Sequence, residues 1–298
     1  MSKKSISLLC YTARLVEDLQ RVGRERTAET YLLAARSFCG FMGNLDVSVQ
    51  QVDFQTVMEY ELHLRSRGLV SNTTSFYLRN LRAIYNRAAD EGIVAQTNPF
   101  RRVYTGTSKT TKRAISADVV RRILMFKTEN QSLRKAIDMF MFSFYTRGMA
   151  FVDMAYLTSK NLKNGNLVYR RRKTGEIITV RWEECMQKIV DRYSSESITY
   201  MLPIIKGNNP RREYLSAAHA VNRNLKRVGA ELGIQTPLTL YVARHSWASI
   251  ALLQQVSIST ISRALGHNSE STTRIYLASL DNSAVDCANR LVLDAISF

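Results

Sequence analysis

The chain has 298 residues, 45% of them hydrophobic and only four of them proline, which excludes a disordered polypeptide and suggests two globular domains. Its 42 lysine and arginine residues against 25 acidic ones give a formal net charge of +17. A protein this basic needs a polyanionic partner or a special habitat, so nucleic acid is the first candidate and an anionic membrane surface the rival. No apolar run reaches the roughly 20 residues of a membrane span, and the four cysteines lack the CxxC spacing of a zinc site. We therefore expect a cytoplasmic protein that uses no metal and no cofactor and has no membrane association.

The first hundred residues have apolar side chains at helical spacing. Candidate N-caps and glycines divide this region into four helices. The expected ranges are Ser5 to Gln20, Thr30 to Phe41 capped by Thr27, Asp53 to Arg67, and Thr73 to Glu91 capped by Ser71. Residues 1–105 thus form the expected first domain.

A basic linker is expected at residues 106–115. The stretch from Arg101 to Arg113 contains no acidic residue and five basic ones, which are Arg101, Arg102, Lys109, Lys112 and Arg113. Such a segment is extended and positive. Two interpretations are equally open, namely a solvated connection between domains and a strap that lies along DNA phosphates.

The second domain, residues 116–298, begins with a helix from Ser116 to about Lys127 and continues with a very apolar helix from Ser132 to Tyr145. Two alternating runs, Asn166 to Arg170 and Ile177 to Arg181, flank a turn that contains Lys173 and predict a β-hairpin. The remainder has helical spacing, including an apolar terminal helix at residues 284–295. The expected fold class is therefore mainly α with a small antiparallel β-sheet.

Four short motifs of this domain contain residues suited to catalysis. They are Tyr145-Thr-Arg147-Gly-Met with Asp153 after it, Lys173 in the turn, Tyr241-Val-Ala-Arg244-His245, and Leu265-Gly-His267 followed by Tyr276. Each alone has an ordinary structural explanation, such as a surface ion pair, a solvated turn or a glycine that ends a helix. Their order and spacing together indicate one shared site.

The ordered set resembles the tyrosine recombinase (phage integrase) family over nearly the whole chain. The most specific match is the segment from Ser259 to Ala278, with the family's Leu-Gly-His, Thr-Thr and Tyr pattern. The run Arg244-His245-Ser246-Trp247 is similar to the family's Arg-His-Thr-Phe. The resemblance implies a helical core-binding domain that clamps DNA, followed by a mixed α/β catalytic domain. It also implies a site-specific DNA recombinase that cleaves and rejoins strands through a 3′-phosphotyrosyl intermediate, in the integration, excision or inversion of DNA.

The chemistry of this reaction explains the basic residues. Transesterification at a DNA phosphate places charge on two non-bridging oxygens, and guanidinium groups stabilise it because they are always charged and bind phosphate as a fork. We assign Arg147 and Arg244 to this role. Lys173 can protonate the leaving 5′ oxygen as a general acid. Its neighbours Arg171 and Arg172 are expected to bind DNA.

The remaining steps fall to two residues near the end of the chain. His267 can hydrogen-bond a phosphate oxygen, and Tyr276 attacks phosphorus after activation by the positive site. The covalent link conserves the bond energy, so we expect no need for ATP. The sequence has no metal-binding signature, so we expect the protein's own cations to hold the phosphate charge.

The sequence departs from the family pattern at two places. Tyr241 stands where the family has a histidine, and a tyrosine can donate a hydrogen bond but is a poor base, so the proton acceptor for the nucleophile is open. His245 is adjacent to Arg244, and we expect it to have a structural role rather than to accept the proton.

The second departure is Ala150, which stands where the first arginine is expected. On a continuous helix Arg147 would reach the same phosphate from one turn away. Asp153 then matches the carboxylate that orients the site. This Arg-Gly-Met arrangement resembles mobile-element integrases and DNA invertases.

DNA binding by the first domain is expected from Arg79 and Arg82, which share a helix face. A solvated outer face is the alternative. The resemblance implies double-stranded DNA with a specific target site as partner, and a homo-tetramer on DNA from a monomer or dimer in solution. The terminal helix either packs on its own domain or docks on a neighbouring subunit.

Two other functions remain open from the residues. A type IB topoisomerase-like enzyme would use the same residue set to relax supercoils without exchanging partners. A catalytically degraded integrase would act as a DNA-binding accessory protein or repressor. Covalent trapping on nicked DNA separates an enzyme from a binding protein.

Overall fold

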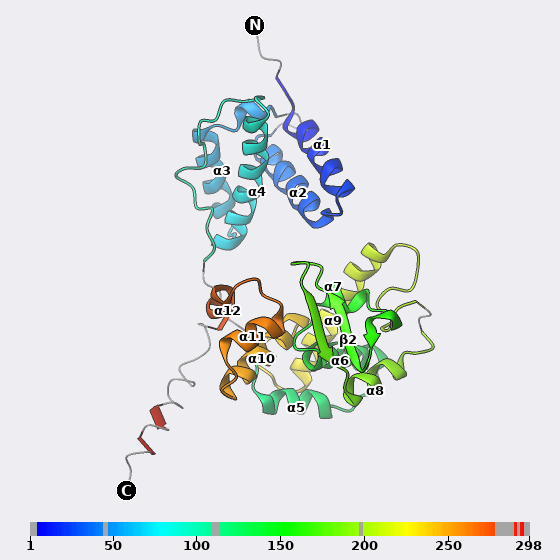
Figure 1. The fold of residues 1–298 in the computed structure, drawn as a ribbon. Helices are drawn as coiled ribbons and strands as arrows, with labels where there is room; N and C mark the ends of the chain where they lie inside the picture. The colour runs from blue at the N-terminus through cyan, green and yellow to red at the C-terminus, as the bar shows by residue number, and fades with distance from the viewer. Residues whose placement is uncertain are drawn as a thin grey trace. The chain divides into compact units, whose positions relative to one another are not determined.

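The computed structural model describes residues 5–43, 47–108, 114–196 and 199–277, together with 289–290 and 293–294 (Figure 1). The side chains of residues 275–277 are outside this description. The predicted linker residues Lys109, Lys112 and Arg113 and most of the predicted terminal helix also lie outside the described residues. The chain divides into two compact units, Met1–Thr110 and Thr111–Phe298.

The first unit is helical, as predicted. Its elements are α1 (Leu8–Arg21), α2 (Glu25–Phe41), the 3-10 turn η1 (Val49–Gln51), α3 (Phe54–Ser66) and α4 (Ser71–Asp90). Helix α2 packs against α1, α3 and α4, and the core contains the fully buried side chains Leu15, Phe38, Tyr60 and Leu78. Asp53 caps α3 by accepting a hydrogen bond from the Thr56 N–H.

The predicted start of α2 is wrong by five residues. The helix begins at Glu25, and Thr27 lies inside its first turn rather than at its cap. A glutamate in the first turn is favoured by the helix dipole, which explains how the helix extends past the threonine.

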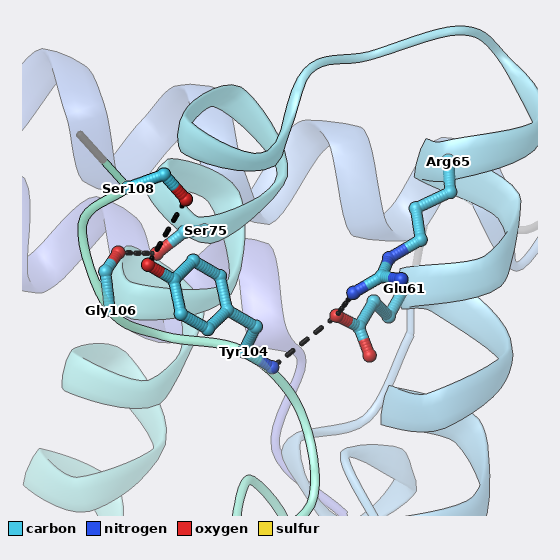
Figure 2. A network of polar contacts seen from close by, with 6 residues as sticks. All are labelled: Glu61, Arg65, Ser75, Tyr104, Gly106 and Ser108. Carbon is cyan, nitrogen blue, oxygen red and sulfur yellow. Dashed lines mark hydrogen bonds and ion pairs between the residues drawn. The ribbon is translucent and has the colours of Figure 1, made fainter. Parts of the chain in front are cut away.

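The chain that follows α4 turns back along the first unit (Figure 2). The backbone N–H of Tyr104 donates to Glu61 Oε1 at 3.3 Å, and Arg65 holds the same carboxylate oxygen at 2.8 Å. The hydroxyl of Ser75 donates to the carbonyl of Gly106. These bonds join the returning chain to α3 and α4.

The returning chain is also fixed at its far end. The side chain of Asn72 donates to the carbonyl of Ser108 at 3.0 Å and accepts from its N–H at 2.8 Å. Residues 104–108 therefore belong to the first unit and are not a free linker.

The second unit is built around α6 (Gln131–Tyr145), which is buried along most of its length, from Leu133 to Ser143. The other elements are α5 (Ala117–Met125), α7 (Phe151–Ala155), the 3-10 turn η2 (Ser159–Asn161), α8 (Glu184–Arg192), α9 (Pro210–Glu231), α10 (Leu240–Leu253), α11 (Ile258–Leu265) and α12 (Glu270–Leu277). Helices α5, α8, α9 and α10 all pack against α6. The apolar run seen in the sequence is therefore the centre of this unit.

A three-stranded antiparallel sheet lies beside the helices, with the order β1 (Leu162–Lys163), β2 (Asn166–Arg170) and β3 (Ile177–Arg181). Val168 pairs with Thr179, and the predicted hairpin between Asn166 to Arg170 and Ile177 to Arg181 is observed. The short strand β1 was not predicted because two residues are too few to show alternation. The fold class, mainly α with a small antiparallel sheet, is confirmed.

Within the described residues, we find no helix with the length and apolar character to cross a membrane.

Candidate active site

A cavity of about 570 Å³ in the second unit contains most of the predicted catalytic side chains. Its lining comes from the segment between α6 and α7, the hairpin turn, α9, α10, and the α11–α12 region. The predicted residues on its wall are Lys173, Tyr241, Arg244 and His267, together with Arg171. The fold thus brings together groups that are separated by almost one hundred residues in the sequence.

Arg244 lies in the first half of α10, and only 6% of it is exposed. Its Nη1 donates to the Gly148 carbonyl at 2.7 Å, and its Nη2 donates to the Leu265 carbonyl at 2.5 Å. A Cβ atom at Gly148 would lie 2.7 Å from the Arg244 Cα, and the φ angle of Gly148 is +74°. Glycine is therefore required at this position. The Arg-Gly-Met motif supplies both the space beside Arg244 and the carbonyl group that its guanidinium binds.

His267 connects Arg244 to helix α12. Its Nε2 lies 3.2 Å from Arg244 Nη2, and its Nδ1 lies 2.8 Å from Thr273 Oγ1. Because a guanidinium can only donate, Nε2 accepts and Nδ1 carries the hydrogen donated to Thr273. Burial lowers the pKa of His267 from 6.5 to about 4, with the charges of Arg244, Arg171 and Lys173 acting in the same direction. The imidazole is therefore neutral at neutral pH.

Arg147 does not share this cavity. Helix α6 ends at Tyr145, and Arg147 has a φ angle of +61°, so the continuous helix that we assumed for its placement does not exist. Its Nη1 donates to the Thr179 carbonyl at 3.3 Å, and it lines a second cavity together with Arg263. In this geometry Arg147 lies apart from the cavity that Arg244 lines, and its predicted role at the phosphate stays a prediction.

Arg171 occupies the first cavity instead. It directly follows β2 and is 7% exposed, and its Nη1 donates to the carbonyl of Gly266. Its backbone is fixed by two turn hydrogen bonds of 2.8 Å, one with Gly175 and one with Glu176. Sequence reasoning placed Arg171 among the DNA-binding side chains and missed its burial, because residues beside a hairpin turn are usually solvated.

Asp153 lies in α7 behind the hairpin turn and is 4% exposed. Its Oδ1 accepts a 2.9 Å hydrogen bond from the backbone N–H of Arg172. Desolvation raises the pKa of the Asp153 carboxyl, although the Arg172 hydrogen bond and the charge of Arg171 oppose the shift. The contact fixes the first residues of the turn that carries Lys173.

Arg172 does not line this cavity. Its guanidinium carbon lies 3.8 Å from the ring centroid of Tyr156, a cation–π stacking distance. Its predicted role in DNA binding stays a prediction.

Tyr241 and His245 lie one turn apart on α10. Tyr241 is 59% exposed and lines the cavity, whereas His245 is 4% exposed. The two rings meet edge to face, with their centroids 4.4 Å apart. His245 is thus the buried support of the exposed tyrosine. Lys173 is exposed on the turn at the rim of the same cavity.

Tyr276 belongs to α12, one turn beyond Thr273. Helix α12 packs against α11, and the Thr273 hydroxyl joins it to His267. The side chain of Tyr276 lies outside the described residues, so its predicted role as nucleophile stays a prediction.

Known protein families match both units. The phage integrase SAM-like domain matches residues 7–106, and the phage integrase family matches residues 113–283. The chain belongs to the phage integrase family. A curated relative of this integrase, the tyrosine recombinase XerA of Thermococcus kodakarensis, is 23% identical over 255 residues, which cover 84% of this chain and 83% of the relative.

Solved structures show the same fold as this integrase. A lambda integrase tetramer bound to a Holliday junction has a TM-score of 0.68 and 18% identity, covering 92% of this chain and 78% of that one. The Tn1549 transposon integrase in complex with a circular intermediate DNA has a TM-score of 0.63 and 14% identity, covering 96% and 99% of the two chains. The fold class predicted from the sequence is the one that these likenesses show.

In the first unit of the integrase, the predicted DNA-binding residues Arg79 and Arg82 are exposed on α4. Arg79 donates to the Thr107 hydroxyl at 3.2 Å, and Arg82 donates to the Thr105 hydroxyl at 2.8 Å. The chain that returns along α4 therefore contacts both guanidinium groups.

Proposed function

We propose that this integrase is a site-specific DNA recombinase in which Tyr276 attacks a DNA phosphate and forms a 3′-phosphotyrosyl bond. The observation that carries the proposal is the cavity of the second unit, where Arg244, Lys173 and His267 meet beside the helix that contains Tyr276. These groups suit the charge and the proton transfer that transesterification at a phosphate requires.

Each residue has a role that follows from its chemistry. As the phenolic oxygen of Tyr276 bonds to phosphorus, its proton passes to solvent water, and the bond from phosphorus to the 5′ oxygen breaks. Lys173 donates a proton to that leaving oxygen. Arg244 stabilises the charge on a non-bridging oxygen, and neutral His267 holds Arg244 by accepting its N–H. The reverse reaction with another 5′ hydroxyl rejoins the strand without ATP.

The assembly and the biological class belong to the same proposal. Double-stranded DNA with a specific site is the substrate, and a tetramer exchanges the strands, which the likeness to the lambda integrase tetramer on a Holliday junction supports. The Arg-Gly-Met motif and the likeness to a transposon integrase favour a mobile-element integrase or DNA invertase.

Covalent trapping tests the proposal. Duplexes that the protein retains are selected from fragments of its source genome, and a nick is placed next to the cleavage position so that the cut strand diffuses away. We expect a protein–DNA adduct that resists denaturant, with the nucleotide on Tyr276 by peptide mass spectrometry. The matched control is Tyr276→Phe, which removes only the nucleophilic oxygen and should give no adduct.

The product then decides the kind of enzyme. On a plasmid with two selected sites, inversion or excision supports a recombinase. Relaxation without exchange would indicate a topoisomerase-like enzyme, and the absence of any adduct on selected DNA would refute the proposal.

A further inference from the structure

We propose that Arg171, from the β-hairpin turn, is the second arginine that binds the scissile phosphate beside Arg244. This inference rests on the proposed function and names a catalytic residue for it. It replaces Arg147, the residue that spacing along the sequence favoured.

The two buried arginines are seated on consecutive carbonyl groups. Arg244 donates to Leu265 and Arg171 donates to Gly266, at the C-terminal end of α11. Carbonyl groups at a helix end lack partners within the helix and lie at the negative end of its dipole, so they attract cations. The helix end thus holds two guanidinium groups side by side at one wall of the cavity.

Gly266 provides the room for this arrangement. It ends α11 in the left-handed conformation, with a φ angle of +61°, and a Cβ atom there would lie 3.3 Å from Arg171 Cδ. The aliphatic stem of Arg171 therefore packs directly against the glycine. Its position is set by the backbone of two elements, the hairpin and the end of α11.

The positive charge of the cavity side chains favours the binding of an anion. Arg171, Arg244 and Lys173 contribute three positive charges, and the nearby carboxylate is Asp153. Burying guanidinium groups is costly unless hydrogen bonds and an opposite charge compensate. A phosphodiester between Arg171 and Arg244 supplies the missing negative charge and the acceptor oxygens.

The cavity also has space where the family pattern expects an arginine. Ala150, which aligns with that position, lines the same cavity as Arg171. A methyl side chain leaves the volume that a guanidinium from the hairpin can use. Arg147, by contrast, donates to Thr179 on β3 and lines the other cavity.

A charge-deleted substrate tests the role of Arg171 directly. The nicked trapping duplex is prepared with either a phosphodiester or a methylphosphonate at the cleavage position. The methylphosphonate has one non-bridging oxygen replaced by a methyl group, so its transition state needs less positive charge from the protein. Single-turnover rates of adduct formation are measured for the wild type, Arg171→Ala and Arg147→Ala.

We expect Arg171→Ala to react about 100- to 1000-fold more slowly than wild type on the phosphodiester. On the methylphosphonate, the two proteins should differ by less than about tenfold, because the charge that Arg171 neutralises is absent. Arg181→Ala, which removes an exposed arginine from the far end of the same sheet, should stay within about threefold of wild type on both substrates. Arg147→Ala is measured beside it because it decides between the two candidate arginines.

A merely structural role for Arg171 would give a different result. Its substitution would then slow the reaction equally on both substrates, and that equality would overturn the inference. If Arg171→Ala does not fold, Arg171→Lys is measured in its place. Lysine keeps the positive charge and the aliphatic part of the side chain but cannot bind two phosphate oxygens as a guanidinium does. The rate of this variant should fall about tenfold on the phosphodiester alone, and an unchanged rate would equally refute the inference.

The failure of this inference is distinguishable from that of the proposed function. If wild type forms no adduct, the proposed function fails. If wild type reacts, Arg147→Ala is inactive and Arg171→Ala is active, then the function stands and Arg147 is the second arginine.

Discussion

Arginine side chains are held in different ways in the two units of this integrase. Arg171 and Arg244 are 7% and 6% exposed and donate to main-chain carbonyl groups. Arg79 and Arg82 are exposed on α4 and donate to threonine hydroxyls. A carbonyl at a helix end moves only with its helix, whereas a side-chain hydroxyl oxygen moves whenever its χ1 rotamer changes. The buried pair is therefore held rigidly, as the proposed chemistry requires, and the exposed pair keeps the freedom that the predicted contact with a DNA backbone needs.

The largest loss of activity should follow from a substitution that displaces the buried Arg244. In Gly148→Ala, the new methyl group meets the Arg244 backbone at 2.7 Å and the φ angle of +74° is unfavourable. We expect adduct formation to slow by at least about 100-fold and the free energy of unfolding to fall by about 2–4 kcal/mol. Single-turnover trapping and urea denaturation measure the two effects.

The matched control is Gly233→Ala, at a φ angle of +63° with open space around the added atom. Its free energy of unfolding should fall by only about 1 kcal/mol, the cost of a left-handed backbone conformation for alanine. Its rate of adduct formation should equal that of wild type. Equal rates for the two variants would show that the space beside Arg244 is not needed.

The exposed pair should affect affinity instead. We expect the double substitution Arg79→Ala, Arg82→Ala to weaken binding to the selected site by about tenfold, and to make the plot of log affinity against log salt shallower by about two units. Filter binding between low and moderate salt measures both. Arg26→Ala, which removes an exposed arginine paired with Glu29 on α2, is the control. An identical loss in this control would mean that only net charge matters.

The pH dependence of stability tests the environment of His267. As the pH falls below 6.5, the unfolded chain takes up a proton that the folded site resists until about pH 4. The folded state therefore loses stability across this window, by about 1–2 kcal/mol after allowance for solvent screening. His267→Gln should lose less stability than wild type between pH 7 and pH 4.5 in urea titrations. His219→Gln, at an exposed position on α9, should behave as wild type, and a wild-type pH profile for His267→Gln would contradict the prediction.

The smallest effect should come from the hydroxyl partners of the exposed pair. Thr105→Val with Thr107→Val removes both acceptors while keeping the shape of the side chains. We expect less than about 0.5 kcal/mol of stability to be lost and less than a twofold change in DNA affinity. Thermal unfolding and filter binding provide the readouts. A tenfold change in affinity would show that the returning chain positions Arg79 and Arg82 for DNA.

Local patterns in the sequence predicted much of this fold. The hairpin and most helices depend on neighbouring residues, so alternation and caps located them. The burial of Arg171 depends instead on its meeting with Gly266, a contact across 95 positions. The direction of Arg147 depends on a single left-handed φ angle after α6. Neither property can be read from residue spacing in the sequence. Motif order therefore predicted that Lys173, Arg244 and His267 share a site, but it did not predict that a second arginine is buried there.

The end of α11 shows how little of a motif can lie in its side chains. Leu265 and Gly266 contribute carbonyl oxygens that every amino acid possesses, and only His267 contributes a side chain to the polar network. What the sequence specifies at the glycine is a backbone shape, the left-handed turn that presents adjacent oxygens. To transplant the proposed anion site, a designer would therefore need to copy a helix ending and two distant arginines. The residues between them would matter less than the backbone conformation.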